Sequence, residues 1–88
     1  MATVASDLVL YGHDACAWCW RVRRTLDRLG VEVEHRDVRR EPRHREELVA
    51  ARGLRTVPVL RILRPEGDQW MAESADIIEY LEERFGRT

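Results

Sequence analysis

The 88-residue chain has no lysine, only two cysteines and no long apolar run. Its fifteen basic residues are all arginines and are balanced by sixteen acidic residues, so the net charge of −1 does not favour a nucleic-acid partner. No stretch approaches the roughly 18 apolar residues that cross a membrane. Because residues 1–10 also lack the basic segment and apolar stretch of a secretory signal, we expect a cytoplasmic protein with no membrane partner.

The two cysteines form a CxxC motif, Cys16-Ala17-Trp18-Cys19, where an apolar strand-like run ends and a helical pattern begins. In a reducing compartment, such a lone pair is more typical of redox chemistry or metal binding than of a structural disulfide. A closed zinc site needs a full tetrahedral set of ligands, and the chain has no second CxxC. His13 offers a third ligand, but the other histidines fall on other predicted elements. We therefore expect no metal site.

Apolar periodicity and turn residues predict seven elements. Strands are expected at residues 8–11, 31–38, 56–63 and 69–72, and helices at residues 16–29, 42–52 and 74–85. Gly30, Gly53 and Gly86 would end the three helices, and Ser74 would cap the last one. Residues 1–6 are expected to form a loose tail.

The resulting order is β-α-β-α-β-β-α. A helix joins the first two strands, which should therefore be parallel by the right-handed crossover rule. A turn at residues 65–68 joins the third and fourth strands, which should be antiparallel. A chain of this length has room for one domain.

Four features together resemble the glutaredoxin family within the thioredoxin fold. The CxxC opens the first predicted helix, and Trp18 precedes its second cysteine. Thr56-Val57-Pro58 matches a tripeptide that carries a cis-proline in these proteins, and a Ser-x-Asp-Ile stretch at residues 74–77 opens the last predicted helix. The resemblance implies a single glutaredoxin-like domain over residues 1–88. Its α/β thioredoxin-like fold would have a four-stranded mixed sheet flanked by three helices.

Several positions depart from the usual pattern of that family. Ala17 replaces the proline most common in the motif, and His13 stands where a basic residue often precedes it. The Gly-Gly pair usual before the last helix is absent. Glu73 and Ser74 stand there instead, and this pair is more similar to the glutathione-binding edge of glutathione transferase N-terminal domains.

The resemblance implies that Cys16 and Cys19 are the catalytic residues. The start of a helix favours a thiolate, which is the attacking species, so Cys16 would be the nucleophile. Cys19, one turn further along and more buried, would be the resolving thiol. We expect a glutathione-dependent oxidoreductase that reduces protein disulfides and protein–glutathione mixed disulfides, with roles in electron transport and cell redox homeostasis.

The same resemblance implies a glutathione site. Glu73 would face the γ-glutamyl ammonium, and the Ser74 hydroxyl and N–H would bind the neighbouring carboxylate. Val57, turned by a cis Pro58, would pair with a bound thiol peptide like an added strand. Trp18 would offer a flat apolar wall. The predicted glutathione-binding residues are His13, Trp18, Thr56, Val57, Pro58, Glu73 and Ser74.

Other interpretations remain open. A dithiol donor fed by thioredoxin reductase would use the same CxxC. Some glutaredoxins carry a [2Fe–2S] cluster between two chains, a role that loss of the motif proline at Ala17 could favour and that Trp18 could hinder. A glutathione transferase is less favoured, because 88 residues leave no space for an all-helical second domain. In the leading interpretation, the chain is a monomer whose partners are glutathione, or an equivalent small thiol, and oxidised proteins.

Overall fold

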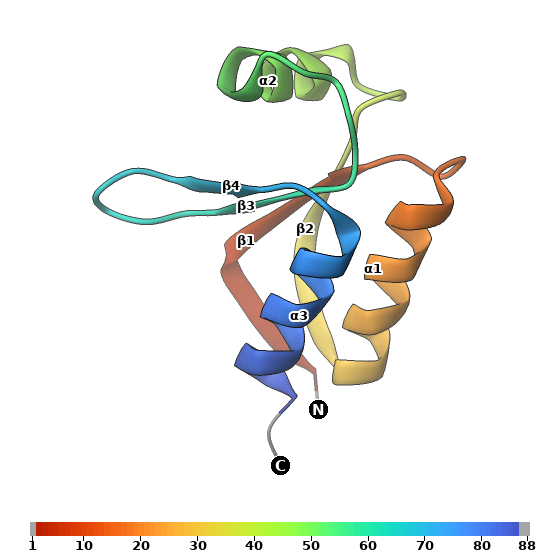
Figure 1. Cartoon of the computed structure of the whole chain (residues 1–88), viewed down its shortest axis with the longest axis vertical. Coiled ribbons are helices and arrows are strands. Elements are labelled where there is room, and N and C mark those ends of the chain that lie inside the picture. The colour runs from red at the N-terminus through yellow and green to blue at the C-terminus, as the bar shows by residue number, and fades with distance from the viewer. Residues whose placement is uncertain (1, 87–88) are drawn as a thin grey trace.

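The structure is a computed structural model that describes residues 2–86. Its elements run in the order β1 (Thr3–Gly12), α1 (Ala17–Leu29), β2 (Val31–Asp37), α2 (Pro42–Arg52), β3 (Val59–Ile62), β4 (Gln69–Met71) and α3 (Ser74–Phe85). The strands form one mixed sheet in the order β2-β1-β3-β4, with β1 parallel to β2 and antiparallel to β3. β3 and β4 pair as an antiparallel hairpin. α1 and α3 lie side by side, whereas α2 lies apart from them (Figure 1).

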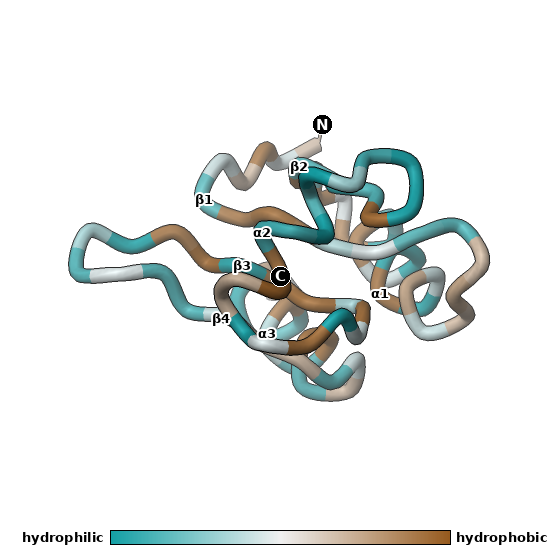
Figure 2. The backbone as a smooth tube through the Cα atoms, turned by 90° about the horizontal axis from the view of Figure 1, so that it is seen from above, coloured by the Kyte–Doolittle hydropathy of each residue, from teal (hydrophilic) through white to brown (hydrophobic). Residues whose placement is uncertain are grey.

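The central strand β1 is buried on both faces because its side chains alternate between two cores. Leu8 and Leu10 pack on the side of α1 and α3, with Val22, Leu26, Leu60, Ile62, Ile77 and Leu81. Val9 and Tyr11 pack on the side of α2, with Val38, Leu48 and Val59. Figure 2 shows apolar stretches in β1 and β3 and hydrophilic residues in the turn that joins β3 to β4. The sheet is therefore the rigid layer from which the loops at its edge project.

One apolar residue and a polar network hold α2 against this sheet. Of the described residues of α2, Leu48 alone is fully buried. Tyr11 donates a hydrogen bond to the Glu47 carboxylate at 3.1 Å, and the Arg36 guanidinium donates to the same carboxylate at 2.9 Å. Arg36 and Arg61 both donate to the Tyr11 hydroxyl oxygen, at 3.1 and 3.2 Å. Beside this polar network α2 buries one residue, whereas α1 buries four.

The predicted fold class, element order and strand directions are confirmed. The loose tail predicted for residues 1–6 is wrong over residues 3–6, because β1 begins at Thr3 and pairs there with Val31 of β2. Met1 lies outside the described residues. No helix within residues 2–86 is long and apolar enough to cross a membrane.

Several element boundaries also differ from prediction, and two of the differences bear on the site. β3 begins at Val59, not at Thr56, because Pro58 has no N–H to donate to a strand ladder. Ser74 is the first residue of α3 rather than its cap. Glu73 occupies the capping position, and no side chain makes a capping hydrogen bond there.

Candidate functional site

Cys16 lies at the start of α1 as its N-cap residue. Its sulfur accepts a hydrogen bond from the backbone N–H of Cys19 at 3.2 Å, so it partners one of the N–H groups that the first helical turn leaves free. The side chain is partly exposed, and its sulfur lies 3.9 Å from the carbonyl oxygen of Val57. A negative charge on Cys16 would be stabilised by this N–H group and by the helix dipole.

Cys19 has the opposite environment, with only 1 % of its surface exposed. Burial, together with its hydrogen bond to Cys16, raises the pKa of the Cys19 thiol to about 12. The end of β1 lies directly against this sulfur, because a Cβ atom placed on Gly12 would stand 2.9 Å from it. Only glycine permits so close an approach. Cys19 is thus held protonated and shielded, one helical turn from Cys16.

A groove of about 330 Å³ opens where α1 and α3 begin and where the chain enters β3. We call it the Trp18 groove. Its lining residues are Trp18, Arg21, Thr56, Val57, Pro58, Ala72, Glu73, Ser74 and Ala75. Every residue predicted to bind glutathione except His13 therefore lies in one groove, although these residues come from three separate segments of the chain.

Two kinds of surface line the groove. The Val57–Pro58 peptide bond is cis, as predicted, and Val57 lies just before β3 with its carbonyl oxygen 3.9 Å from the Cys16 sulfur. The groove is also lined by the indole of Trp18, which is 56 % exposed. Backbone and an apolar surface in one groove suit a short peptide in extended conformation.

The first turn of α3 closes the groove. Glu73 has a φ of 67°, the one positive value among the described non-glycine residues. Such a conformation costs about 1–3 kcal/mol and is common at ligand-binding sites. The first N–H groups of a helix are available to an anion, and Ser74 opens α3. Figure 1 shows that α1 and α3 run in the same direction, and the groove is lined by residues from the first turn of each helix.

Sequence reasoning missed Arg21, which lies in the same groove. Its guanidinium carbon stands 5.2 Å from the centroid of the Trp18 ring. The sequence offered one indication: Trp18 and Arg21 are three positions apart, and residues at this spacing share a helix face. Arg21 gives the groove a positive charge close to the negative charge of Glu73.

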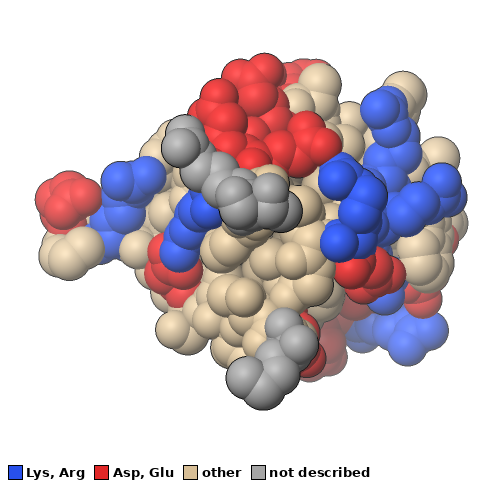
Figure 3. All heavy atoms as spheres, turned by 90° about the horizontal axis from the view of Figure 1, so that it is seen from below, with Lys and Arg blue, Asp and Glu red and all other residues tan. Residues whose placement is uncertain are grey.

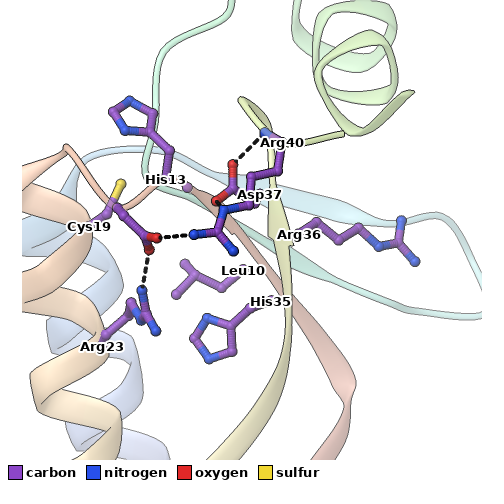
Figure 4. Close-up of a pocket in the computed structure, with 10 residues that line it drawn as sticks. Leu10, His13, Cys19, Arg23, His35, Arg36, Asp37 and Arg40 are labelled. Atoms are coloured by element: carbon purple, nitrogen blue, oxygen red, sulfur yellow. Dashed lines mark hydrogen bonds and ion pairs between the residues drawn. The ribbon is translucent and has the colours of Figure 1, made fainter. Parts of the chain in front are cut away.

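The structure does not bring His13 to the Trp18 groove. His13 lines a second hollow of about 260 Å³ on the other side of the motif, where Cys19 and Arg23 also lie (Figure 4). The His13 carbonyl oxygen accepts the backbone N–H of Cys16 at 3.3 Å, and this turn carries the side chain away from the groove. The prediction that His13 lies in the same groove as the other predicted glutathione-binding residues is therefore wrong.

The loop before Cys16 is held in place by a residue to which the sequence assigned no role. The indole N–H of Trp20 donates to the carbonyl oxygen of Asp14 at 2.6 Å. The Asp14 carboxylate pairs with Arg23 and with Arg40, each at 3.2 Å. These contacts fix the approach of the chain to Cys16.

Within residues 2–86, no group of three or more His, Cys, Asp and Glu residues is arranged to hold a metal ion.

The mixed sheet, the CxxC at the start of α1 and the cis-proline opposite it define a thioredoxin-like fold. The chain belongs to the family of glutathione S-transferase N-terminal domains, whose family model matches residues 10–88. The Glu73–Ser74 pair resembles this family, whereas a glutaredoxin-type activity depends on the CxxC. No curated protein sequence matches the chain.

Solved structures agree with this family. A maleylacetoacetate isomerase from Anaeromyxobacter dehalogenans is 32 % identical with a TM-score of 0.68, over 92 % of this chain and 37 % of that one. A glutathione transferase homologue from Drosophila mojavensis, solved with bound glutathione, is 28 % identical with a TM-score of 0.76, over 94 % and 37 % of the two chains. An epsilon-class transferase from the housefly Musca domestica is 28 % identical with a TM-score of 0.71, over 92 % and 36 %. This chain thus spans less than two fifths of the length of these relatives.

Proposed function

We propose that this domain catalyses glutathione-dependent thiol–disulfide exchange, reducing protein–glutathione mixed disulfides and protein disulfides. The observation that carries the proposal is the position of Cys16. Its side chain is partly exposed, and its sulfur accepts a helix N–H group and lies 3.9 Å from the carbonyl oxygen of Val57, a residue that lines a groove suited to a peptide. Family membership supports glutathione as the peptide, because one related structure contains bound glutathione.

Glutathione would lie along the Trp18 groove in extended form. The backbone of its cysteine would pair with Val57, which places the glutathione sulfur beside Cys16. Its γ-glutamyl carboxylate would accept the Ser74 N–H at the start of α3, and its ammonium group would face Glu73. Trp18 would cover the apolar side of the peptide.

The reaction would proceed by two exchanges. The Cys16 thiolate attacks the glutathione sulfur of a mixed disulfide, a Cys16–glutathione disulfide forms, and the protein thiolate leaves and takes up a proton. A second glutathione thiolate then attacks the glutathione sulfur of that adduct. Oxidised glutathione leaves and the Cys16 thiolate is restored, so each turnover consumes one free glutathione thiol and releases one protein thiol.

Cys19 would take part in the reduction of protein disulfides. When Cys16 forms a mixed disulfide with a protein, the Cys19 thiol attacks the Cys16 sulfur, loses its proton, and releases the reduced protein thiolate. The high pKa of Cys19 keeps it protonated until that step. The Cys16–Cys19 disulfide is then reduced by two molecules of glutathione. Mixed disulfides with glutathione would not need Cys19.

Family membership favours a second candidate, in which this domain binds glutathione for addition to an electrophile or for isomerisation. The related isomerase and transferase structures are much longer than this chain, so such an activity would require further sequence. In that case the glutathione thiol would react directly, and Cys16 would be dispensable.

Two single substitutions test the proposal. We expect Cys16→Ser to abolish reduction of a glutathionylated protein by glutathione, because no nucleophile remains at the groove. Cys19→Ser should retain that activity and lose reduction of protein disulfides. Full deglutathionylation by Cys16→Ser would contradict the proposal, and glutathione addition to an electrophile that survives in Cys16→Ser would favour the second candidate.

A further inference from the structure

Helix α1 carries a row of arginines that the proposed reaction does not use. Arg21, Arg24 and Arg28 follow one another at spacings of three and four residues, so they share one face of the helix. All three are exposed. Arg28 pairs with Glu82 of α3 at 2.6 Å, whereas neither Arg21 nor Arg24 has an ion pair within residues 2–86. Within the described chain, the row therefore has two positive charges that no carboxylate pairs with, although Arg21 also lies over the Trp18 ring.

A shallow hollow of about 270 Å³ follows this row. We call it the α1 hollow. Its lining residues are Arg21, Arg24, Thr25, Arg28 and Ile78. Among the residues described, no carboxylate lines it. Arg21 lines both this hollow and the Trp18 groove, so the two lie next to each other at this side chain.

The charge distribution at the surface agrees with this arrangement. In Figure 3, several basic side chains gather on the right of the view, the side on which α1 lies in Figure 1. Of the carboxylates of α3, Glu82 reaches the row, and it is already paired with Arg28. A negatively charged partner at Arg24 would therefore meet attraction without having to displace an internal carboxylate.

We propose that the α1 hollow binds an acidic segment of the protein substrate while the mixed disulfide of that substrate lies at Cys16. This inference rests on the proposed function and names the class of protein that it would serve. Carboxylates of the substrate would pair with Arg24 and Arg21, and the stems of the arginines with Ile78 would give the segment an apolar floor.

The length of α1 sets the position of the acidic residues. Arg24 comes eight positions after Cys16, which is about 12 Å along a helix. An extended peptide covers that distance in about four residues. Acidic side chains three to five positions from the modified cysteine would therefore reach the arginine row. Each exposed charge pair should change affinity about two- to fivefold, and added salt should weaken the effect.

Two synthetic peptides test the proposal. Each carries one cysteine in a mixed disulfide with glutathione, and three to five positions away it has either glutamates or glutamines. Binding is measured on the Cys16→Ser variant, which cannot react, and turnover is measured on the wild-type protein. We expect the glutamate peptide to bind about tenfold more tightly at low salt, and to lose most of that advantage in the Cys16→Ser variant that also carries Arg24→Glu.

Arg43→Glu is the matched control, because it makes the same change of charge at an exposed arginine of α2. It should leave the preference for the glutamate peptide intact. Equal binding of the two peptides, or an equal loss of preference in Arg43→Glu, would overturn the proposal. Preferential binding of the glutamate peptide without turnover by the wild-type protein would support docking and contradict the proposed function, so the two failures are distinguishable.

Discussion

At the scale of single residues, the two cysteines of the motif differ in environment. Cys16 is partly exposed, whereas Cys19 is 1 % exposed and has a pKa raised to about 12. A thiolate is the reacting species, and the raised pKa of Cys19 lowers the thiolate population of this residue near neutral pH. Cys16 is therefore accessible to solvent, whereas Cys19 is shielded from it.

Alkylation should therefore be selective. With the reduced protein and iodoacetamide at pH 7.5 or so, we expect Cys16 to be modified first and Cys19 at least about a hundredfold more slowly. Peptide mapping by mass spectrometry at successive times measures both rates. The denatured protein is the control, in which the two rates should converge. Similar rates in the folded protein would contradict the burial of Cys19.

Glu73 has both a strained backbone conformation and a charged side chain, and it lines the Trp18 groove. Because its φ of 67° suits glycine, Glu73→Gly should raise the free energy of unfolding by about 1 kcal/mol, while it weakens glutathione binding by removing the carboxylate. Glu73→Ala is the control, since it loses the same carboxylate and keeps the strain. Chemical denaturation and glutathione titration measure the two effects. If Glu73→Gly were less stable than Glu73→Ala, the result would contradict the backbone strain at this position.

At the scale of elements, the helices are attached to the sheet unequally. α1 buries four residues, whereas Leu48 alone is fully buried in α2. Elements with few buried apolar contacts open at low free-energy cost. We therefore expect amide hydrogens of α2 to exchange faster than those of α1, as measured by hydrogen exchange with mass spectrometry. Leu48→Ala should destabilise the protein by about 2–4 kcal/mol. Slower exchange in α2 than in α1 would contradict this ranking.

The sequence predicted the elements well where periodicity and turn residues agreed. The apolar periodicity of residues 16–29 and Gly30 predicted α1, and the apolar run at residues 8–11 predicted a strand within β1. The start of β1 at Thr3 was missed because its first residues are held by pairing with Val31, a contact that no local pattern records. The cap of α3 was misplaced because the backbone of Glu73 takes a conformation that glutamate rarely adopts.

The site was predictable only where residues carried a motif. The CxxC, the Thr-Val-Pro tripeptide and the Glu-Ser pair each had a recognisable pattern, and the fold brings them to one groove. Arg21 had no motif and enters the groove through its position on α1. His13 was expected there because it stands where a basic residue often precedes the CxxC motif in glutaredoxins, but it lines the second hollow, on the other side of the motif.

At the scale of the whole molecule, one ion pair joins two elements that are distant in sequence and another lies within the β3–β4 hairpin. Asp7 of β1 pairs with Arg84 of α3 at 2.9 Å, and Asp68 in the hairpin turn pairs with Arg61 at 2.7 Å. Hydrogen bonds from Arg84 and from Arg61 lower the pKa of Asp7 and of Asp68, respectively, below the ordinary value of 3.8. These carboxylates therefore stabilise the folded state only while they are ionised.

The free energy of unfolding should consequently fall with acidification. A carboxyl whose folded-state pKa lies below its unfolded value contributes stability above the unfolded pKa and loses it as the pH falls through the folded one. We expect stability to hold above about pH 5 and to decline below about pH 4. Urea denaturation at several pH values across this range measures the free energy of unfolding. Asp7→Asn should be less stable than the wild type at pH 7, by a difference that shrinks at pH 2, whereas Glu66→Gln, at an exposed position in the hairpin turn, should follow the wild type. A constant difference for Asp7→Asn would contradict this account.

The site draws its parts from the whole chain, since α1, the loop before β3 and the start of α3 meet only when the sheet is formed. Formation of the Cys16–glutathione adduct is the measurement that tests this assembly most directly. The Cys19→Ser variant is mixed with oxidised glutathione, and the rate of adduct formation is followed by intact mass, with peptide mapping to locate the modified sulfur. We predict a single glutathionyl group on Cys16, formed faster than on a cysteine in an unfolded peptide and slowed by Glu73→Ala. A rate equal to that of the unfolded peptide and indifferent to Glu73→Ala would contradict the claim that the groove presents glutathione to Cys16.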